Sequence, residues 1–396
     1  MKNRFDVFST NVISIYLLSL PTLFLINNLV IPKIRFVLTI VLFIFQIVYV
    51  KYPKKNEINV SIILLILMSI IYGIRKEYVY FIYIPPLIVF VHFFYLFNSK
   101  STNVLKKIEY ARLFLFGILI AAIIGLTYMY TSGVYVKGGE YNENSWVISN
   151  IYIPILLGIS TIYIYYSKIY KSKFIYSFIY IIAIIFILIT LVFLEKRLPI
   201  VCAIISIVII NNFWQRKTFI NLIVLILLLY PIYSTFLLQI ITPITESDLF
   251  VTIFKRNDDL LDVSINGRVI RIIAALEFIS NIQFVNLFYY PTEIVLSTDI
   301  VHNHFHNLIL QLYYERGAIS VVSFLIILFK SMKNYTLNST SVSPMLKSII
   351  LYLILIGTNE SVLGFCSMTE FCTFSFILIT LGISDDIQNA EVQNKI

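Results

Sequence analysis

Three of the chain's four histidines stand within five residues, in the segment Val301-His-Asn-His-Phe-His-Asn-Leu308. They are His302, His304 and His306, and they lie where a long polar stretch meets a hydrophobic run that we expect to be helical. A neutral imidazole can take a proton from a hydroxyl group near neutral pH. The segment is therefore the first candidate for acid–base chemistry in a chain made mostly of apolar segments.

Two other interpretations of the histidine segment stay open. In the first, Asn303 or Asn307 caps the helix and the histidines only face water. In the second, the histidines bind zinc, but their i, i+2, i+4 spacing is not a standard zinc pattern, and no convincing cysteine or carboxylate ligand accompanies it. We therefore predict no metal site and no cofactor.

Three arginines are candidates to bind an anion near the histidines. Arg197 directly precedes an apolar run, and Arg268 and Arg271 share a segment with helical periodicity. Guanidinium groups match phosphate oxygens bidentately and would offset the charge that develops on a diphosphate leaving group. Alternatively, Arg197 pairs with Glu195 at the membrane interface and the other two bind lipid headgroups.

Two carboxylates, Glu360 and Glu370, stand at or inside predicted membrane spans. Ionisable groups in that setting usually face a cavity or pair with a partner. Either carboxylate would orient His306 or form a structural ion pair with an arginine, and the sequence leaves both roles open. We count Glu360 among the candidate substrate-binding residues.

The elements that must position these side chains are apolar helices. The chain of 396 residues is 59% hydrophobic and 13% charged, whereas a soluble domain has about 25% charged residues. Its repeated apolar runs of about 17–22 residues are long enough to cross a hydrocarbon core of about 30 Å. We therefore predict an all-α fold, a polytopic helical membrane protein.

We predict about twelve transmembrane helices with approximate ends. They lie at 9–31, 36–50, 58–74, 78–97, 111–130, 147–166, 174–194, 198–213, 218–240, 306–329, 345–360 and 363–383. With the N-terminus inside, 18 of the 30 basic residues, Lys347 among them, fall in inner loops, as the positive-inside tendency requires. This bias accounts for the net charge of +9 without a nucleic-acid partner.

One large extracytoplasmic loop interrupts the spans. It divides the chain into residues 1–240 with the first nine spans, 241–305 with the loop, and 306–396 with the last three spans and a short cytoplasmic tail. Within the loop, residues 268–280 have helical periodicity, with Arg268, Arg271 and Glu277 toward one side. We expect an amphipathic helix there, lying on the outer leaflet.

Two segments and one arginine resemble a known superfamily of membrane enzymes. His306-Asn-Leu-Ile-Leu310-Gln-Leu-Tyr-Tyr-Glu315-Arg-Gly317 resembles the His-Asn-x-x-Leu…Glu-x-Gly signature of the O-antigen ligase and polymerase (Wzy-like) superfamily, which also opens a late span after a large periplasmic loop. Gly267-Arg268…Ala274-Ala-Leu-Glu277 is similar to the Gly-Arg…Ala-Ala-Leu-Glu stretch of that loop. Arg197 stands where the superfamily has Ser-Arg at the outer start of a span.

The chain also departs from the superfamily's pattern. Lys196 replaces the usual serine before the arginine, and Ile272 replaces a common tryptophan. The Gly-x-Gly that usually follows the loop helix is missing from residues 285–292. The resemblance therefore covers mainly residues 190–320.

The resemblance implies an inverting, metal-independent glycosyltransferase that uses polyprenyl-diphosphate-linked oligosaccharide at the outer face of the bacterial cytoplasmic (inner) membrane. By matching position, His306 would be the general base on the acceptor hydroxyl, and Arg197 and Arg268 would hold the diphosphate. We expect substrate contacts from Arg271, His302, His304, Asn307 and Glu360.

Within this superfamily we prefer a repeat-unit polymerase of O-antigen, capsule or exopolysaccharide to a ligase, because polymerases are extremely divergent and this chain matches only in short pieces. A flippase of lipid-linked oligosaccharide is a third candidate, but it predicts cations in the middle of several spans, which here are almost free of Lys and Arg. The expected partners are the lipid-linked oligosaccharide, membrane lipid, a chain-length regulator and a flippase.

Overall fold

The computed structural model describes eight segments of the chain, and seven of them are helices. The described residues are 13–22, 57–75, 104–132, 152–169, 198–212, 287–288, 308–332 and 343–357. The pair 287–288 is a single turn, and no β-strand occurs in any of these segments. The predicted all-helical fold is therefore confirmed for this part of the chain.

Six labelled helices make up most of the described structure. They are α3 (Glu57–Arg75), α5 (Val104–Ser132), α6 (Tyr152–Ile169), α8 (Leu198–Asn212), α12 (Leu308–Met332) and α13 (Ser343–Gly357). A shorter apolar helix covers Ile13–Thr22. Each of these helices coincides with a predicted span. The ends of α3, α6, α8, α12 and α13 agree with the prediction to within five residues. Helix α5 begins seven residues before the predicted span at 111, and the described helix Ile13–Thr22 covers only part of the predicted span 9–31.

The other parts of the predicted topology lie outside the described residues. These are the spans at 36–50, 78–97, 174–194, 218–240 and 363–383, and the amphipathic helix at 268–280. Two of the described helices are long and apolar enough to cross a membrane, over Glu109–Thr127 in α5 and Leu308–Leu328 in α12.

Three of the helices begin in the same way. Pro154, Pro199 and Pro344 lie in the first turns of α6, α8 and α13. Proline is well placed there, because the first N–H groups of a helix have no partner inside the helix and the proline ring already holds φ near its helical value. The apolar runs that follow then continue each helix.

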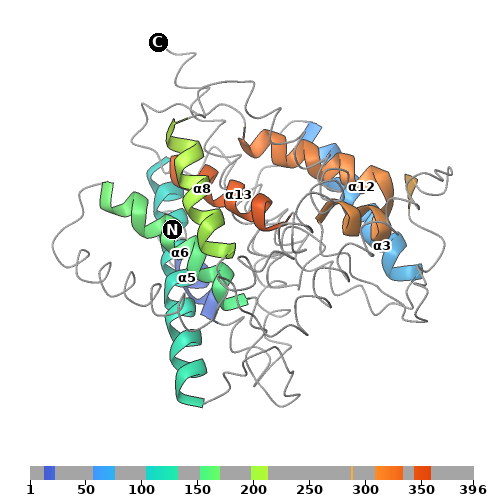
Figure 1. Cartoon of the computed structure of the whole chain (residues 1–396). Helices are drawn as coiled ribbons and strands as arrows, with labels where there is room; N and C mark the ends of the chain where they lie inside the picture. Colours follow the sequence, from blue (N-terminus) through green and yellow to red (C-terminus); the bar gives the residue numbers. More distant parts are fainter. Residues whose placement is uncertain are drawn as a thin grey trace, which may run out of the picture.

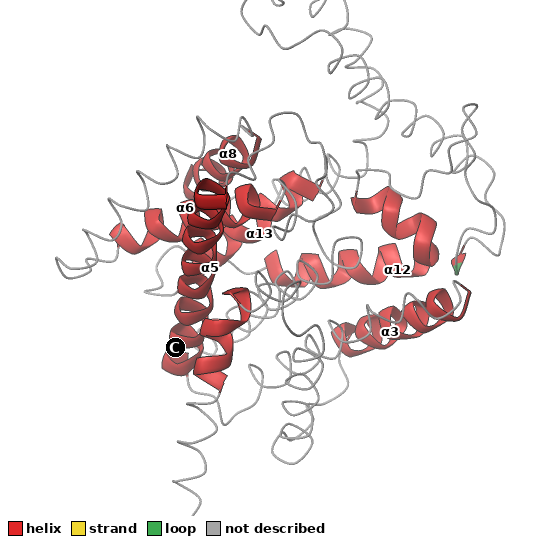
Figure 2. Cartoon of the chain, turned by 90° about the horizontal axis from the view of Figure 1, so that it is seen from below, coloured by secondary structure: helices red, strands yellow, loops and turns green. Residues whose placement is uncertain are grey.

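The helices pack in two groups that meet at α12 and α13 (Figure 1). In one group, α6 packs against α5, α8 and α13, and α13 also packs against α8. In the other, α3 lies alongside α12, a pairing that is plain in the view from below (Figure 2). One hydrophobic core runs through both groups, with Leu65, Phe114, Ile162, Phe324 and Leu353 among its buried side chains.

A close contact joins α6 and α13. The phenol ring of Tyr352 lies where a Cβ atom on residue 158 would be, so only glycine fits at Gly158. The Tyr352 hydroxyl donates a hydrogen bond of 3.0 Å to the carbonyl oxygen of Ile155. Small residues allow this kind of close approach between helices.

A network of hydrogen bonds joins the ends of α6, α8 and α13. The Tyr166 hydroxyl donates to Asn211 Oδ1 at 3.2 Å and lies 2.8 Å from Ser348 Oγ, while Asn211 Nδ2 donates to the Tyr165 hydroxyl at 3.2 Å. Since the one Tyr166 hydrogen goes to Asn211, the Ser348 hydroxyl donates to Tyr166. The predicted topology assigns all three of these helix ends to the inner face.

Lys347, which we expected in an inner loop, is instead fully buried within α13.

On α3 and α8 the exposed face is apolar and the buried face carries serines. Every exposed side chain described on these two helices is Val, Ile or Leu: Val60, Ile63, Leu67, Ile70 and Ile74 on α3, and Val201, Ile204, Ile205 and Val208 on α8. Serines lie on the buried side, where Ser69 donates to the Leu65 carbonyl and Ser206 to the Ala203 carbonyl. Soluble helices show the reverse, with polar side chains outward.

Candidate functional site

The predicted site residues lie outside the described part of the chain. They are Arg197, Arg268, Arg271, His302, His304, His306, Asn307 and Glu360, and Glu370 is outside as well. Their roles stay predictions. The structure does describe α12, which begins at Leu308, directly after His306 and Asn307, and which contains the rest of the signature segment.

The first half of α12 carries polar side chains into the protein interior. Gln311, Glu315 and Arg316 are 2%, 7% and 0% exposed, and the neighbouring signature residue Leu310 is buried too. Gln311 Nε2 donates a hydrogen bond of 2.7 Å to Glu315 Oε1. These two residues are four apart and so lie on the same face of the helix. This half of α12 is therefore built around a polar interior contact.

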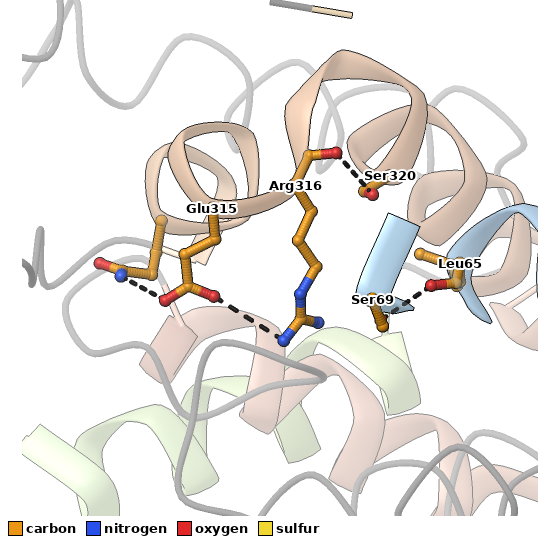
Figure 3. A network of polar contacts seen from close by, with 6 residues as sticks. Leu65, Ser69, Glu315, Arg316 and Ser320 are labelled. Carbon is orange, nitrogen blue, oxygen red and sulfur yellow. Dashed lines mark hydrogen bonds and ion pairs between the residues drawn. The ribbon is translucent and has the colours of Figure 1, made fainter. Parts of the chain in front are cut away.

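Arg316 joins this polar contact to α3. Its Nη2 atom lies 3.8 Å from Glu315 Oε2, and the charged ends of the two side chains face each other (Figure 3). Its guanidinium carbon lies 5.5 Å from the centroid of the Tyr72 ring on α3, within reach of a cation–π interaction. Arg316 is among the largest fully buried side chains of the described residues. A buried charge needs such partners, because it has lost its hydration.

The helix breaks directly after Arg316. Gly317 has φ 72° and ψ 177°, a combination that is essentially restricted to glycine. The carbonyl of Arg316 lies at the break, and the Ser320 hydroxyl donates to its oxygen at 2.8 Å (Figure 3). A side chain thus supplies a hydrogen bond to a carbonyl at the position where the regular ladder of the helix is interrupted.

A turn from the predicted outer loop fills the space beside the break. A Cβ atom on residue 317 would collide with the backbone carbonyl groups of Leu287 and Phe288. These two half-buried residues are the part of 241–305 that the structure describes. Glycine is required at 317 for two reasons, namely its backbone conformation and the close approach of another backbone.

The described arrangement is suited to holding the first half of α12 in a fixed position. It combines a carboxylate, an amide and a guanidinium between α12, α3 and the 287–288 turn, in apolar surroundings where such interactions are strong. Among the described residues, no group of three or more His, Cys, Asp or Glu side chains could hold a metal ion. The histidine segment lies outside these residues.

Arg316 and Tyr72 are the residues that sequence reasoning missed. Arg316 occupies the variable position of the Glu-x-Gly signature, but it stands ten residues inside a predicted span and beside a glutamate. A cation that deep in an apolar run is itself a signal, since ionisable groups within spans are costly. Tyr72 carries no comparable signal, because its partner lies far away in the sequence.

Comparison with known proteins does not assign the chain to a family. No protein-family model matches the chain, and no curated protein matches it. The resemblance to the O-antigen ligase and polymerase superfamily therefore depends on the sequence of residues 190–320 alone.

Proposed function

We propose that the chain is a multi-pass membrane glycosyltransferase, a polysaccharide repeat-unit polymerase. It transfers glycan from a polyprenyl-diphosphate carrier to a sugar hydroxyl at the outer face of the bacterial cytoplasmic membrane. The observation that carries the proposal is the broken helix directly after His306, in which the signature residues Glu315 and Gly317 each have a definite structural part.

The faces of α3 and α8 support the membrane part of the proposal. Their exposed side chains are all aliphatic, while serines and charged residues are buried among the described helices. Hydrocarbon tails accept aliphatic side chains at no cost, and helices in lipid associate through small and polar residues. The same faces would be unfavourable in water, because a large exposed apolar patch promotes association.

The structure around Gly317 supports the catalytic part. An ordinary apolar span needs neither a buried Glu–Arg pair nor a residue with positive φ, and both carry a cost in stability. Such features persist where the surrounding structure holds them, and they gather at functional sites. Both features lie on α12, which begins two residues after His306. The general base of the proposal is thus joined to a rigidly held element.

The proposed reaction is a displacement at the anomeric carbon. His306 takes the proton from the acceptor hydroxyl, and the oxygen forms a new bond to the anomeric carbon as the bond to the diphosphate oxygen breaks. The lipid diphosphate leaves with the electron pair, and Arg197 and Arg268 offset its charge. The anomeric configuration inverts. The carrier bond already stores the required energy, so the step uses no nucleotide.

Deleting the gene and analysing the surface glycan on gels tests the proposed class. Single repeat units on the lipid carrier support the polymerase. Long polymer retained on the carrier supports a ligase of the same superfamily, which differs from the polymerase in its acceptor. Absence of lipid-linked units at the outer face supports a flippase. Either of the last two results overturns the polymerase proposal.

Replacing His306 by alanine tests the catalytic base. Loss of a general base costs on the order of 10²–10⁴ in rate, so we expect no polymer from a chain that still inserts normally. His302→Ala is the matched control, because it removes a neighbouring imidazole without removing the base, and it should reduce polymer far less. Full-length polysaccharide from the His306→Ala chain would disprove the assignment.

A further inference from the structure

We propose that the turn at Leu287 and Phe288 is a brace, which docks on the break at Gly317 and holds the His306 end of α12 in place for transfer. Gly317 and the two brace residues then act as positioning residues. This inference rests on the proposed function, since it assigns them a part in that reaction.

The contact between the brace and α12 is made by backbone. The carbonyl groups of Leu287 and Phe288 occupy the space that a side chain on residue 317 would need. Gly317 also has a positive φ, so this conformation and the neighbouring turn together exclude every residue with a side chain. A contact with two independent requirements for glycine is specific, whereas an ordinary apolar contact tolerates many side chains.

The depth of Gly317 in the predicted span explains why another segment must cover the break. Gly317 lies nine residues after the first residue of α12, which corresponds to about 14 Å along a helix and to nearly half of a hydrocarbon core of about 30 Å. Backbone that leaves the helical pattern at such depth is tolerated where protein covers it. Gly317 is buried, and the turn at 287–288 is part of that cover.

The contacts of Arg316 hold the same point of α12 from a second helix. The guanidinium lies over the Tyr72 ring of α3 and faces the Glu315 carboxylate. The first half of α12 is therefore fixed at its C-terminal end, next to Gly317, by α3 and by the brace together. Because His306 stands only two residues before this half-helix, undocking the brace would let the base move. A misplacement of about 1 Å can cost about 10²-fold in rate.

Cysteine labelling tests the docking of the brace. In a full-length chain with Cys202, Cys366 and Cys372 replaced by alanine, Leu287→Cys is labelled with a membrane-impermeant maleimide, and denatured protein sets the fully exposed rate. We expect Gly317→Ala to raise the labelling rate about tenfold or more, because the added methyl group strains the backbone and displaces the turn. An unchanged rate would overturn the brace.

Gly158→Ala is the matched control for this experiment. Residue 158 is also too crowded for a Cβ atom, but its neighbour is Tyr352 in the other group of helices. It should lower thermal stability without changing the labelling rate at position 287. Equal increases in labelling from both glycine variants would show general loosening and would overturn the specific contact.

A kinetic measurement tests the positioning role. With lipid-linked repeat units in proteoliposomes, we expect Gly317→Ala to lower kcat about 10²-fold while KM changes much less, since binding groups elsewhere are retained. If that variant does not fold, Leu287→Gly together with Phe288→Gly loosens the brace without altering α12, and it should lower kcat in the same way. Increased labelling with an unchanged kcat would overturn the positioning role.

Failure of the proposed function is distinguishable from failure of the brace. If gene deletion leaves the surface glycan unchanged, the polymerase proposal fails, and the labelling rates still report whether the turn docks on Gly317. If His306→Ala abolishes transfer but the brace variants retain full kcat, the reaction stands and the positioning role fails.

Discussion

Replacing Arg316 by methionine should destabilise the protein, because it removes the cation of a buried ion pair. At the observed separation of 3.8 Å between Arg316 Nη2 and Glu315 Oε2, Coulomb's law gives about 4 kcal/mol with an effective dielectric constant of about 20. The cation–π contact with Tyr72 adds about 0.5–2 kcal/mol. Methionine also leaves the Glu315 carboxylate buried without its cation. Breaking a buried pair in this way costs about 3–5 kcal/mol, and that is the expected loss in free energy of unfolding.

Two companion variants separate the charge effect from loss of packing. Glu315→Gln combined with Arg316→Met removes both charges, and the glutamine still accepts the hydrogen bond from Gln311. Since replacing a whole buried pair is often nearly neutral, the double variant should recover about half of the loss or more. Arg316→Lys keeps a cation over the Tyr72 ring and should be intermediate in stability.

Thermal unfolding of the purified chain in detergent, followed by size-exclusion chromatography of the remaining folded protein, measures these differences. The expected order of stability is wild type, then Arg316→Lys and the double variant, then Arg316→Met. The reasoning would be refuted if Arg316→Met were as stable as wild type, or if the double variant were as unstable as Arg316→Met alone.

Three further predictions concern other parts of the molecule. Arg268→Lys should abolish most transfer activity if the guanidinium binds phosphate bidentately, whereas wild-type turnover of that variant would favour a contact with lipid headgroups. Tyr166→Phe removes the hydroxyl at the centre of the network between three helices and should lower stability by about 1–2 kcal/mol, while Tyr165→Phe, at an exposed ring, should change it less. Gly158→Ala should cost about 1–3 kcal/mol by overlap with the Tyr352 ring, and a chain that unfolds at the wild-type temperature would contradict that contact.

The positions of the helices were predictable because their signals are local. Apolar runs of sufficient length predicted α3, α8 and α13 to within three residues at each end. Pro199 and Pro344 mark the beginnings of two of them, since proline fits the first turn of a helix and disrupts its interior. Each of these signals can be recognised without knowing what the helix packs against.

The pairing of the helices was not predictable, because aliphatic faces carry little information about their partners. Nothing in residues 57–75 indicates that they lie along α12, more than two hundred residues later in the chain. The case of Gly317 is similar. The signature marks it as important, but the reason for a glycine lies in the backbone of Leu287 and Phe288. Tyr72 could not be predicted as a contact, because its partner, Arg316, belongs to that unpredicted pairing.

The break in α12 also has a mechanical consequence. An unbroken helix is a stiff rod, so any change in the tilt of its membrane-embedded part swings the opposite end. The first half, Leu308–Arg316, is nine residues long, or about 13 Å, and a tilt change of about 10° would move its far end by about 2 Å. In the proposed membrane protein, the break at Gly317 lets the second half of α12 change its tilt with bilayer thickness without carrying the first half with it. In that setting, tilt changes of the second half would not be transmitted to Leu308, the first residue of α12.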